Sequence, residues 1–242
     1  MPSRNKDRFE SFCLTHPGWF PNRDFFTEKS DELPFGSGHG FNEQKAENSV
    51  RLSTIQPISV WQVLQSTGVY RADENKIWML EDFRQAYAWL VEEMEQRIGP
   101  RPPGVCWPVW AWYKTNGQIG RVDLRRREHW TFEPSVCIDF EMPDDQVVLT
   151  DFDAWHCVLN NWACVENEAE ANLFDRLEKT LSSEAFQQRK KETWQRIFRL
   201  DPHEDYYWSG KVEDIQATFW ELRLKDVTGV RHCRTYKKNP SH

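Results

Sequence analysis

Glu221 is a candidate cleft residue because aromatic and cationic side chains flank it in an alternating segment. Residues 216–224 alternate in the manner of a β-strand. Such alternation predicts that Phe219, Glu221 and Arg223 share one face, with the carboxylate between a ring and a guanidinium. A carboxylate placed between a ring and a guanidinium can belong to a functional cleft. The alternative interpretation is a surface ion pair between Glu221 and Arg223.

A second group of residues has the side-chain types that hold a flat ligand with an anionic end. Trp110, Trp112 and Tyr113 lie within four successive residues, and Arg125 follows shortly after them. Exposed rings stack on planar ligands, and a guanidinium binds anions through paired hydrogen bonds. The alternative is that these rings pack in the core, with Trp110 and Trp112 on one strand face and Tyr113 on the other.

Other common site patterns are missing from the sequence. It contains no phosphate-cradling loop, dinucleotide fingerprint, zinc-protease helix motif or serine-hydrolase elbow. The glycine-rich stretch 36–40 neither follows a clear strand nor opens a helix, so it is interpreted as a flexible segment. His156, Cys157 and Cys164 lack the spacing of a zinc knuckle, and no metal site is predicted. The six cysteines form no CxxC pair and are interpreted as reduced thiols.

The pattern of apolar residues predicts the elements that position these side chains. Helical spacing of Phe83, Tyr87, Leu90 and Met94 before Gly99 predicts a helix over about residues 81–98. Further helices are predicted after Pro57, after the capping residue Asp151, and near residues 166–181 and 183–200. Strands are predicted at residues 51–56, 108–113, 135–142, 146–150, 216–224 and 229–236. Strands at both ends of the chain with helices between them predict an α+β fold, a mixed sheet with packed helices.

Length and composition predict one domain with a tryptophan-rich core. The chain has 242 residues, among them 13 Trp and 15 Phe, whose rings each bury a large apolar area. Residues 49–238 are predicted to form the single α+β domain. Residues 1–48 are predicted to be an irregular N-terminal extension, and residues 239–242 a tail.

The charge balance argues against a nucleic-acid partner. The formal net charge is -7, from 31 basic and 38 acidic residues. The short basic runs 125–127 and 190–191 are interpreted as solvated surface. No apolar run reaches the roughly 18 residues that cross a bilayer, and the first ten residues are charged. The sequence therefore predicts a cytoplasmic protein with no membrane contact, and its partner, a protein or another macromolecule, is unknown.

Six motifs in order resemble the bacterial family known as domain of unknown function 3841. They are Thr54-Ile-Gln56, Ala86-Tyr-Ala-Trp-Leu90, Trp110-Ala-Trp-Tyr113, Asp123-Leu-Arg125, Thr150-Asp-Phe-Asp-Ala-Trp-His156 and Ile215-Gln-Ala-Thr-Phe-Trp-Glu-Leu-Arg-Leu224. The resemblance covers about residues 51–236. This family has no assigned activity.

A more distant likeness is to small relatives of the ADP-ribosyltransferase fold. It implies an enzyme that cleaves the nicotinamide–ribose bond of its co-substrate NAD and acts on a macromolecular target or on NAD itself. By this likeness, Gln56 grips the nicotinamide ribose, and Glu221 engages the ribose 2′-hydroxyl and stabilises an oxocarbenium-like charge. Tyr113, with Trp112 beside it, contacts the nicotinamide, and Arg125 pairs with the diphosphate.

Two positions depart from the ADP-ribosyltransferase pattern. Gln56 stands where a first-strand His or Arg is usual, and Phe219 stands where a Glu or Gln precedes the catalytic glutamate. The alternative hypothesis is therefore a non-catalytic module that binds a protein or a nucleotide through the same fold.

Overall fold

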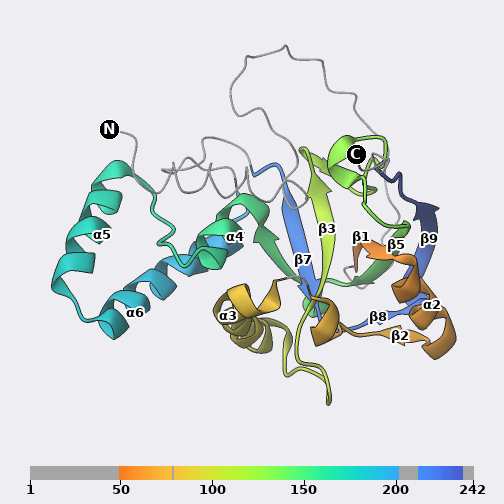
Figure 1. Cartoon of the computed structure of the whole chain (residues 1–242), viewed down its shortest axis with the longest axis horizontal. Coiled ribbons are helices and arrows are strands. Elements are labelled where there is room, and N and C mark those ends of the chain that lie inside the picture. The colour runs from red at the N-terminus through yellow and green to blue at the C-terminus, as the bar shows by residue number, and fades with distance from the viewer. Residues whose placement is uncertain (1–48, 78, 202–211, 237–242) are drawn as a thin grey trace, which may run out of the picture.

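The computed structural model of the chain describes residues 49–77, 79–201 and 212–236 (Figure 1). They form five α-helices, a seven-stranded sheet and a separate two-stranded ribbon. The predicted α+β class is confirmed. A mixed sheet was expected. Every ladder between the described strands is antiparallel. The predicted N-terminal extension, the glycine-rich stretch 36–40 and the tail lie outside the described residues.

The large sheet brings together strands from both ends of the chain. Its order is β6-β7-β3-β1-β5-β9, with β4 paired to the end of β3. The longest ladder joins β1 to β5 over all nine residues of each strand. The strands are β1 (Ser49–Pro57), β3 (Val109–Thr115), β4 (Gln118–Ile119), β5 (Ser135–Pro143), β6 (Val148–Asp151), β7 (Ile215–Phe219) and β9 (Val227–His232).

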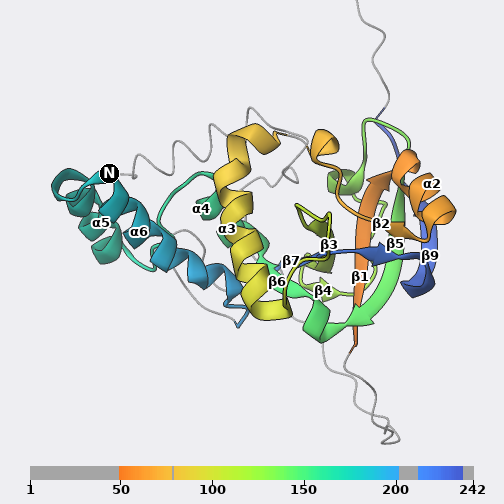
Figure 2. The ribbon, with the colours of Figure 1, turned by 90° about the horizontal axis from the view of Figure 1, so that it is seen from below.

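Helices cover both faces of this sheet. On one face α2 (Ile58–Thr67) follows β1 directly and ends at Gly68, whose φ of 77° is the left-handed value that glycine adopts easily. On the other face lie α3 (Leu80–Ile98) and α4 (Phe152–Leu159) (Figure 2). The predicted cap of α4 is confirmed, because the Asp151 carboxylate accepts hydrogen bonds from two backbone N–H groups of the first turn.

Strand alternation divides the core into two clusters. Val109 and Ala111 of β3 pack with the α2 face, whereas Trp110 packs with α3 and α4. The sequence left open whether the Trp110 ring packs in the core or stacks on a ligand. One side of the ring packs in the core. The α2 cluster is built around Leu52 and Phe140, which are fully buried and lie opposite each other in the β1–β5 ladder.

The last predicted strand is split, which corrects the expected alternation over residues 216–224. β7 ends at Phe219, and β8 (Leu222–Arg223) leaves the sheet to pair with β2 (Val69–Tyr70). Trp220 and Leu222 were expected on one face, yet they belong to opposite core clusters. Alternation holds only while a strand stays in one sheet, and the competing partner β2 ends it here.

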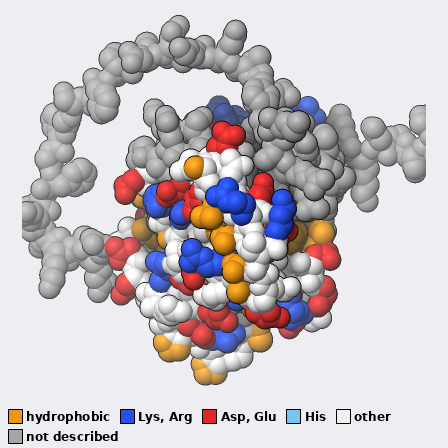
Figure 3. Space-filling model, turned by 90° about the vertical axis from the view of Figure 1, so that its left-hand side faces the viewer, with side chains coloured by type: hydrophobic (Ala, Val, Ile, Leu, Met, Phe, Trp, Pro, Cys, Tyr) orange, Lys and Arg blue, Asp and Glu red, His pale blue; other side chains and the backbone are white. Residues whose placement is uncertain are grey.

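Helices α5 (Glu168–Thr180) and α6 (Ser183–Trp194) form a hairpin that projects from the body of the molecule (Figure 1). Arg196 anchors it through two hydrogen bonds to the Glu170 carboxylate, of 2.8 and 2.9 Å. Acidic and basic side chains intersperse at its outer end (Figure 3). Lys190, expected on a solvated face, instead donates a hydrogen bond to the Asn161 carbonyl, and burial lowers its pKa.

Candidate functional site

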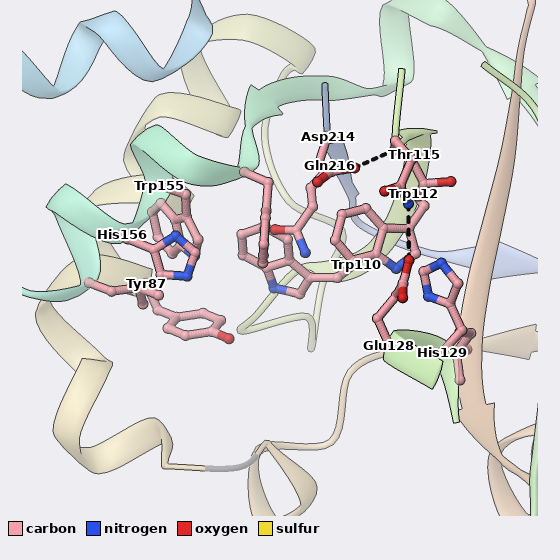
Figure 4. A pocket seen from close by; sticks show the side chains of 14 residues that line it. Tyr87, Trp110, Trp112, Thr115, Glu128, His129, Trp155, His156, Asp214 and Gln216 are labelled. Carbon is pink, nitrogen blue, oxygen red and sulfur yellow. Dashed lines mark hydrogen bonds between the residues drawn. The ribbon is translucent and has the colours of Figure 1, made fainter. Parts of the chain in front are cut away.

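A cavity of about 370 Å³ lies between the sheet and α4 (Figure 4). Tyr87 and Trp155 lie at one end of its lining with His156 beside them, and the carboxylates lie toward the other end, where Trp112 contacts His129. The side chains come from α3, β1, β3, α4 and β7, from the short helix η2 (Arg127–His129), and from the segments before β4 and β7. The lining residues are Ile55, Tyr87, Trp110, Trp112, Thr115, Asn116, Glu128, His129, Phe152, Trp155, His156, Leu159, Asp214 and Gln216.

The rings of the lining hold one another in edge-on contacts. The centroids of Tyr87 and Trp110 are 6.0 Å apart, and those of Tyr87 and Trp155 are 6.1 Å apart, both in T-shaped geometry. Trp112 contacts Phe152 in the same way, at 5.1 Å. Because each ring is wedged by its neighbours, this wall is formed before any ligand arrives.

A tight turn gathers the polar end. Asn116 and Gly117 link β3 to β4 with φ values of 51° and 77°, the pair of left-handed residues that a type I′ hairpin requires. The Asn116 backbone N–H donates to Asp214 Oδ1 at 2.6 Å, and its side-chain Nδ2 donates to Glu128 Oε1 at 3.1 Å. The turn thus holds two carboxylates from distant segments beside one cavity.

The electrostatic character of the cavity is acidic. Glu128 and Asp214 are carboxylates, and the described residues that line the cavity include no lysine or arginine. Arg126, outside the lining, donates one hydrogen bond to Glu128 at 3.2 Å. The site therefore attracts hydrogen-bond donors and positive charge and repels anions.

His129 brings a buried hydrogen-bonding group to the lining. It is only 6% exposed, and burial lowers its pKa, so the imidazole is neutral at pH 7. Its Nε2 has no hydrogen-bond partner among the residues that the structure describes. A buried polar atom of this kind is destabilising unless a ligand or water bonds to it.

His156 is a second neutral histidine, at the α4 side of the cavity (Figure 4). Burial lowers its pKa to about 4. Its Nδ1 lies 3.2 Å from the Asp153 carbonyl oxygen, which accepts only, so the proton is assigned to Nδ1. The remaining ring nitrogen is then a hydrogen-bond acceptor.

Of the five site residues predicted from the sequence, Trp112 alone lines this cavity. Tyr113, the next residue of β3, packs on the opposite face of the sheet with the α2 cluster. Gln56 is on that face too, where its Nε2 donates to Thr54 Oγ1 at 2.8 Å. The structure therefore separates Trp112 from Tyr113 and Gln56 by the thickness of the sheet.

Glu221 and Arg125 lie apart from the cavity and from each other. The Glu221 carboxylate, 11% exposed, accepts hydrogen bonds from Arg71 at 2.7 Å and from Arg223 at 3.4 Å. Since Phe219 lies opposite Val109 in the ladder, the end of β7 is about 13 Å from Tyr113 along the strands, and the chain leaves the sheet before Glu221.

Arg125 is 81% exposed and forms a two-bond pair with the neighbouring Asp123, at 2.8 and 2.9 Å. The structure thus brings none of the predicted catalytic and cofactor-binding residues together. Their functional roles stay predictions.

Several lining residues were missed at the level of sequence. The Asn116-Gly117 dipeptide is a strong hairpin signal and would have located the turn. Asp214 and Gln216 carry no comparable signal, because they stand at the start of an ordinary strand. Glu128 and His129 follow an arginine run that was interpreted as solvated surface.

A closed ionic cluster lies on the same sheet face as the cavity. Cross-strand register sets Trp112 opposite Ser53, and Ser53 opposite Asp139. The Asp139 carboxylate accepts hydrogen bonds from Ser53 at 2.6 Å, from Arg121 at 3.0 Å, and from Arg231 at 2.8 and 2.9 Å. Burial raises the pKa of Asp139, but these donors together outweigh it and lower the pKa.

Residues 51–228 match the family model described as a domain of unknown function (DUF3841). The chain belongs to this family. The predicted family resemblance is thereby confirmed, and the DUF3841 domain contains every residue of the cavity lining. No curated protein and no solved structure matches the chain. Within its described part, the DUF3841 domain has no helix with the length and hydrophobicity that a membrane crossing requires.

Proposed function

We propose that this domain binds a flat, nitrogen-containing heteroaromatic ligand in the cavity between the sheet and α4. The observation that carries the proposal is a single cavity lined both by interlocked rings and by acidic, hydrogen-bonding side chains. Its size of about 370 Å³ falls in the range of small-molecule pockets, roughly 300–1,000 Å³. This is the binding-module alternative, with a base or nucleoside as ligand.

The polar end defines which edge the ligand presents. Glu128, Asp214 and the Gln216 carbonyl are acceptors, so they suit a ring amine, a carboxamide or a cationic ring. The His129 imidazole supplies one further hydrogen bond. A phosphate placed between the two carboxylates would be repelled, so the phosphates of a nucleotide would have to lie outside the cavity.

Thermal unfolding with added ligands tests the proposal, using nicotinamide, its N-methyl cation, adenosine and AMP as probes. A ligand at about a hundred times its dissociation constant stabilises the fold by about 2.7 kcal/mol, which raises Tm by several degrees. Trp112→Ala should abolish the shift. Tyr113→Ala is the matched control, since the adjacent residue faces the other side of the sheet.

The outcomes of this experiment separate the two faces of β3. A shift lost in Trp112→Ala and kept in Tyr113→Ala supports the cavity. A shift lost only in Tyr113→Ala contradicts it and moves the ligand to the α2 face. The absence of a shift with all four probes also counts against the proposal.

NAD cleavage by an ADP-ribosyltransferase-like enzyme is the second candidate. One observation favours it: Trp112, expected to bind the cofactor, lines a cavity whose rings and carboxylates suit the cationic nicotinamide ring of NAD. In such a reaction the ribose–nitrogen bond breaks, neutral nicotinamide leaves, and a nucleophile from a macromolecular target or water attacks the ribose. Glu221 would have to exchange its Arg71 partner for the ribose.

Chromatographic detection of nicotinamide released from NAD tests this second candidate. Release lost in Glu221→Gln and kept in Glu128→Gln supports the catalytic role of Glu221. Release lost only in Glu128→Gln places the chemistry in the cavity instead. If the wild-type protein releases none, the NAD-cleaving candidate fails and the binding proposal stands on its own test.

A further inference from the structure

A group of rings and arginines lies at the surface where residues 127–132 meet residues 234–236. Phe132 is 69% exposed and stacks on Tyr236, with ring centroids 4.9 Å apart and planes 25° apart. Trp130 contacts Tyr236 at 5.5 Å. These three rings and the guanidinium groups of Arg127 and Arg234 are called the aromatic–arginine patch.

Neither arginine of the patch is paired with a carboxylate of the described residues. The Arg127 and Arg234 guanidinium carbons lie 5.7 and 5.9 Å from the Trp130 ring centroid. No described carboxylate forms an ion pair with either group, whereas the neighbouring Arg125 and Arg126 each pair with an acidic residue. Two cations held over ring faces, with no counter-charge from the described residues, form a site for an anion.

Backbone hydrogen bonds fix the patch in place. The Thr131 N–H donates to the Arg234 carbonyl at 2.9 Å, and the Tyr236 N–H donates to the Thr131 carbonyl at 2.9 Å. The Tyr236 hydroxyl donates to the Arg127 carbonyl at 2.7 Å. Because the two segments are already joined, little conformational entropy is lost when a ligand binds.

The local charge is opposite in sign to that of the whole chain. Segments 121–133 and 231–236, together with Asp139, which pairs with Arg121 and Arg231, contain six arginines and four acidic residues, although the formal net charge of the chain is -7. The argument from total charge against a nucleic-acid partner therefore does not apply at this surface. Electrostatic attraction depends on the local potential, since charges beyond about 10 Å are screened.

We propose that the aromatic–arginine patch binds a single-stranded polynucleotide. Bases stack on the open face of Phe132, while Arg127 and Arg234 contact the phosphates. An acidic peptide would use the two guanidinium groups but would leave the flat, exposed ring of Phe132 without a partner. The patch is separate from the cavity, although η2 contributes to both: Arg127 belongs to the patch, and Glu128 and His129 line the cavity.

Fluorescence anisotropy of labelled oligonucleotides tests the proposal with the full chain. The probes are oligo-dT and oligo-rU of about 12 nucleotides, within the site sizes known for single-strand binding. Phe132→Ala should raise Kd at least fivefold, as expected for the loss of one stacked base, whereas Leu173→Ala, which removes an exposed apolar residue from α5, should leave Kd unchanged.

The salt dependence tests the arginines separately. Arg127→Gln with Arg234→Gln should weaken binding and reduce the slope of log K against log salt by about 1.4, since each phosphate contact contributes about 0.7. Arg101→Gln with Arg189→Gln removes the same charge from exposed positions elsewhere and should leave the slope unchanged. Binding of either oligonucleotide with these effects supports the proposal.

Three results would overturn it. One is no anisotropy change with either oligonucleotide at up to about 100 μM protein and low salt. Another is equal affinity of Phe132→Ala and the Leu173→Ala control. The third is competition by poly-glutamate as effective as that by unlabelled oligonucleotide, which would identify a surface for acidic peptides.

Discussion

The two faces of the central sheet are built by the same strands and differ in what they bury. The α2 face is a continuous apolar cluster around Leu52, Phe140 and Phe219, all fully buried. The opposite face carries large rings that line a cavity, together with the Asp139 ionic cluster. One step along β3, from Trp112 to Tyr113, passes from one environment to the other.

This difference shows how a single antiparallel sheet separates stability from binding. Aliphatic and phenyl side chains on the α2 face interdigitate closely, so buried area dominates there. On the other face, edge-on indoles hold a space open, and polar groups such as His129 and Asp214 border it. We expect the first face to respond to loss of volume and the second to changes of ionisation.

The largest expected effect is on the α2 face. Phe140→Ala leaves a cavity in the fully buried cluster, where the centroids of the Phe140 and Phe219 rings are 5.3 Å apart. The free energy of unfolding should fall by about 3–5 kcal/mol, measured by urea denaturation. Phe132→Ala is the control, since that exposed ring should contribute less than about 0.5 kcal/mol. Equal effects at the two positions would contradict the comparison.

Acidification should lower the free energy of unfolding through His156, which lies on the cavity face. Its pKa is about 4 in the folded chain because of burial and about 6.5 when unfolded. Burial of the neutral side chain therefore makes its full contribution to stability above about pH 6.5. This contribution is lost as the pH falls from about 6.5 to 4. The loss should total roughly 3 kcal/mol.

Urea denaturation at several pH values measures this loss. His156→Gln should flatten the profile over the same pH range, whereas His232→Gln changes an exposed histidine and should not. If the wild-type and His156→Gln profiles are parallel, His156 is not the group responsible.

Removing the charge of Asp139 should give a smaller loss of stability. It comes from a side chain that is charged in the folded state, whereas His156 is neutral there. Asp139→Asn removes the charge that holds Arg121 and Arg231, and unfolding free energy at pH 7 should fall by roughly 1.5–3 kcal/mol. Because the folded pKa is lowered, the contribution is present above the unfolded pKa of about 3.9 and is lost as pH falls below it. The wild-type and variant curves should therefore converge in acid.

The exposed pair of Glu141 and Arg51 on the same ladder is the matched control for this cluster. Glu141→Gln should lower the free energy of unfolding by less than about 1 kcal/mol. An effect as large as that of Asp139→Asn would show that burial of the cluster does not strengthen it.

The smallest predicted change separates stability from binding most sharply. Asn116→Gly keeps a residue that tolerates the positive φ, but it removes the hydrogen bond to Glu128. Unfolding free energy should change by no more than about 1 kcal/mol, whereas the ligand-induced Tm shift should fall. Asn116→Ala adds backbone strain and should be less stable than Asn116→Gly by about 1 kcal/mol or more. If the ligand-induced Tm shift is unchanged in both variants, the turn has no role in ligand binding at the proposed site.

The sequence determined the local elements of this protein and its family. Helical spacing located α3, and Asp151 located the start of α4. These signals are short-range, because capping, helical periodicity and strand alternation involve residues a few positions apart. The ordered motifs located the DUF3841 domain.

Only the tertiary structure decided which residues share a site. Alternation separated Trp112 from Tyr113, but the helices packed on each face decided which ring borders a cavity. Glu128 and Asp214 come from segments without periodicity, and they meet through the Asn116 turn. Glu221 pairs with Arg71 because the chain leaves the sheet after Phe219 to join β2, a long-range choice between competing partners that no local pattern encodes.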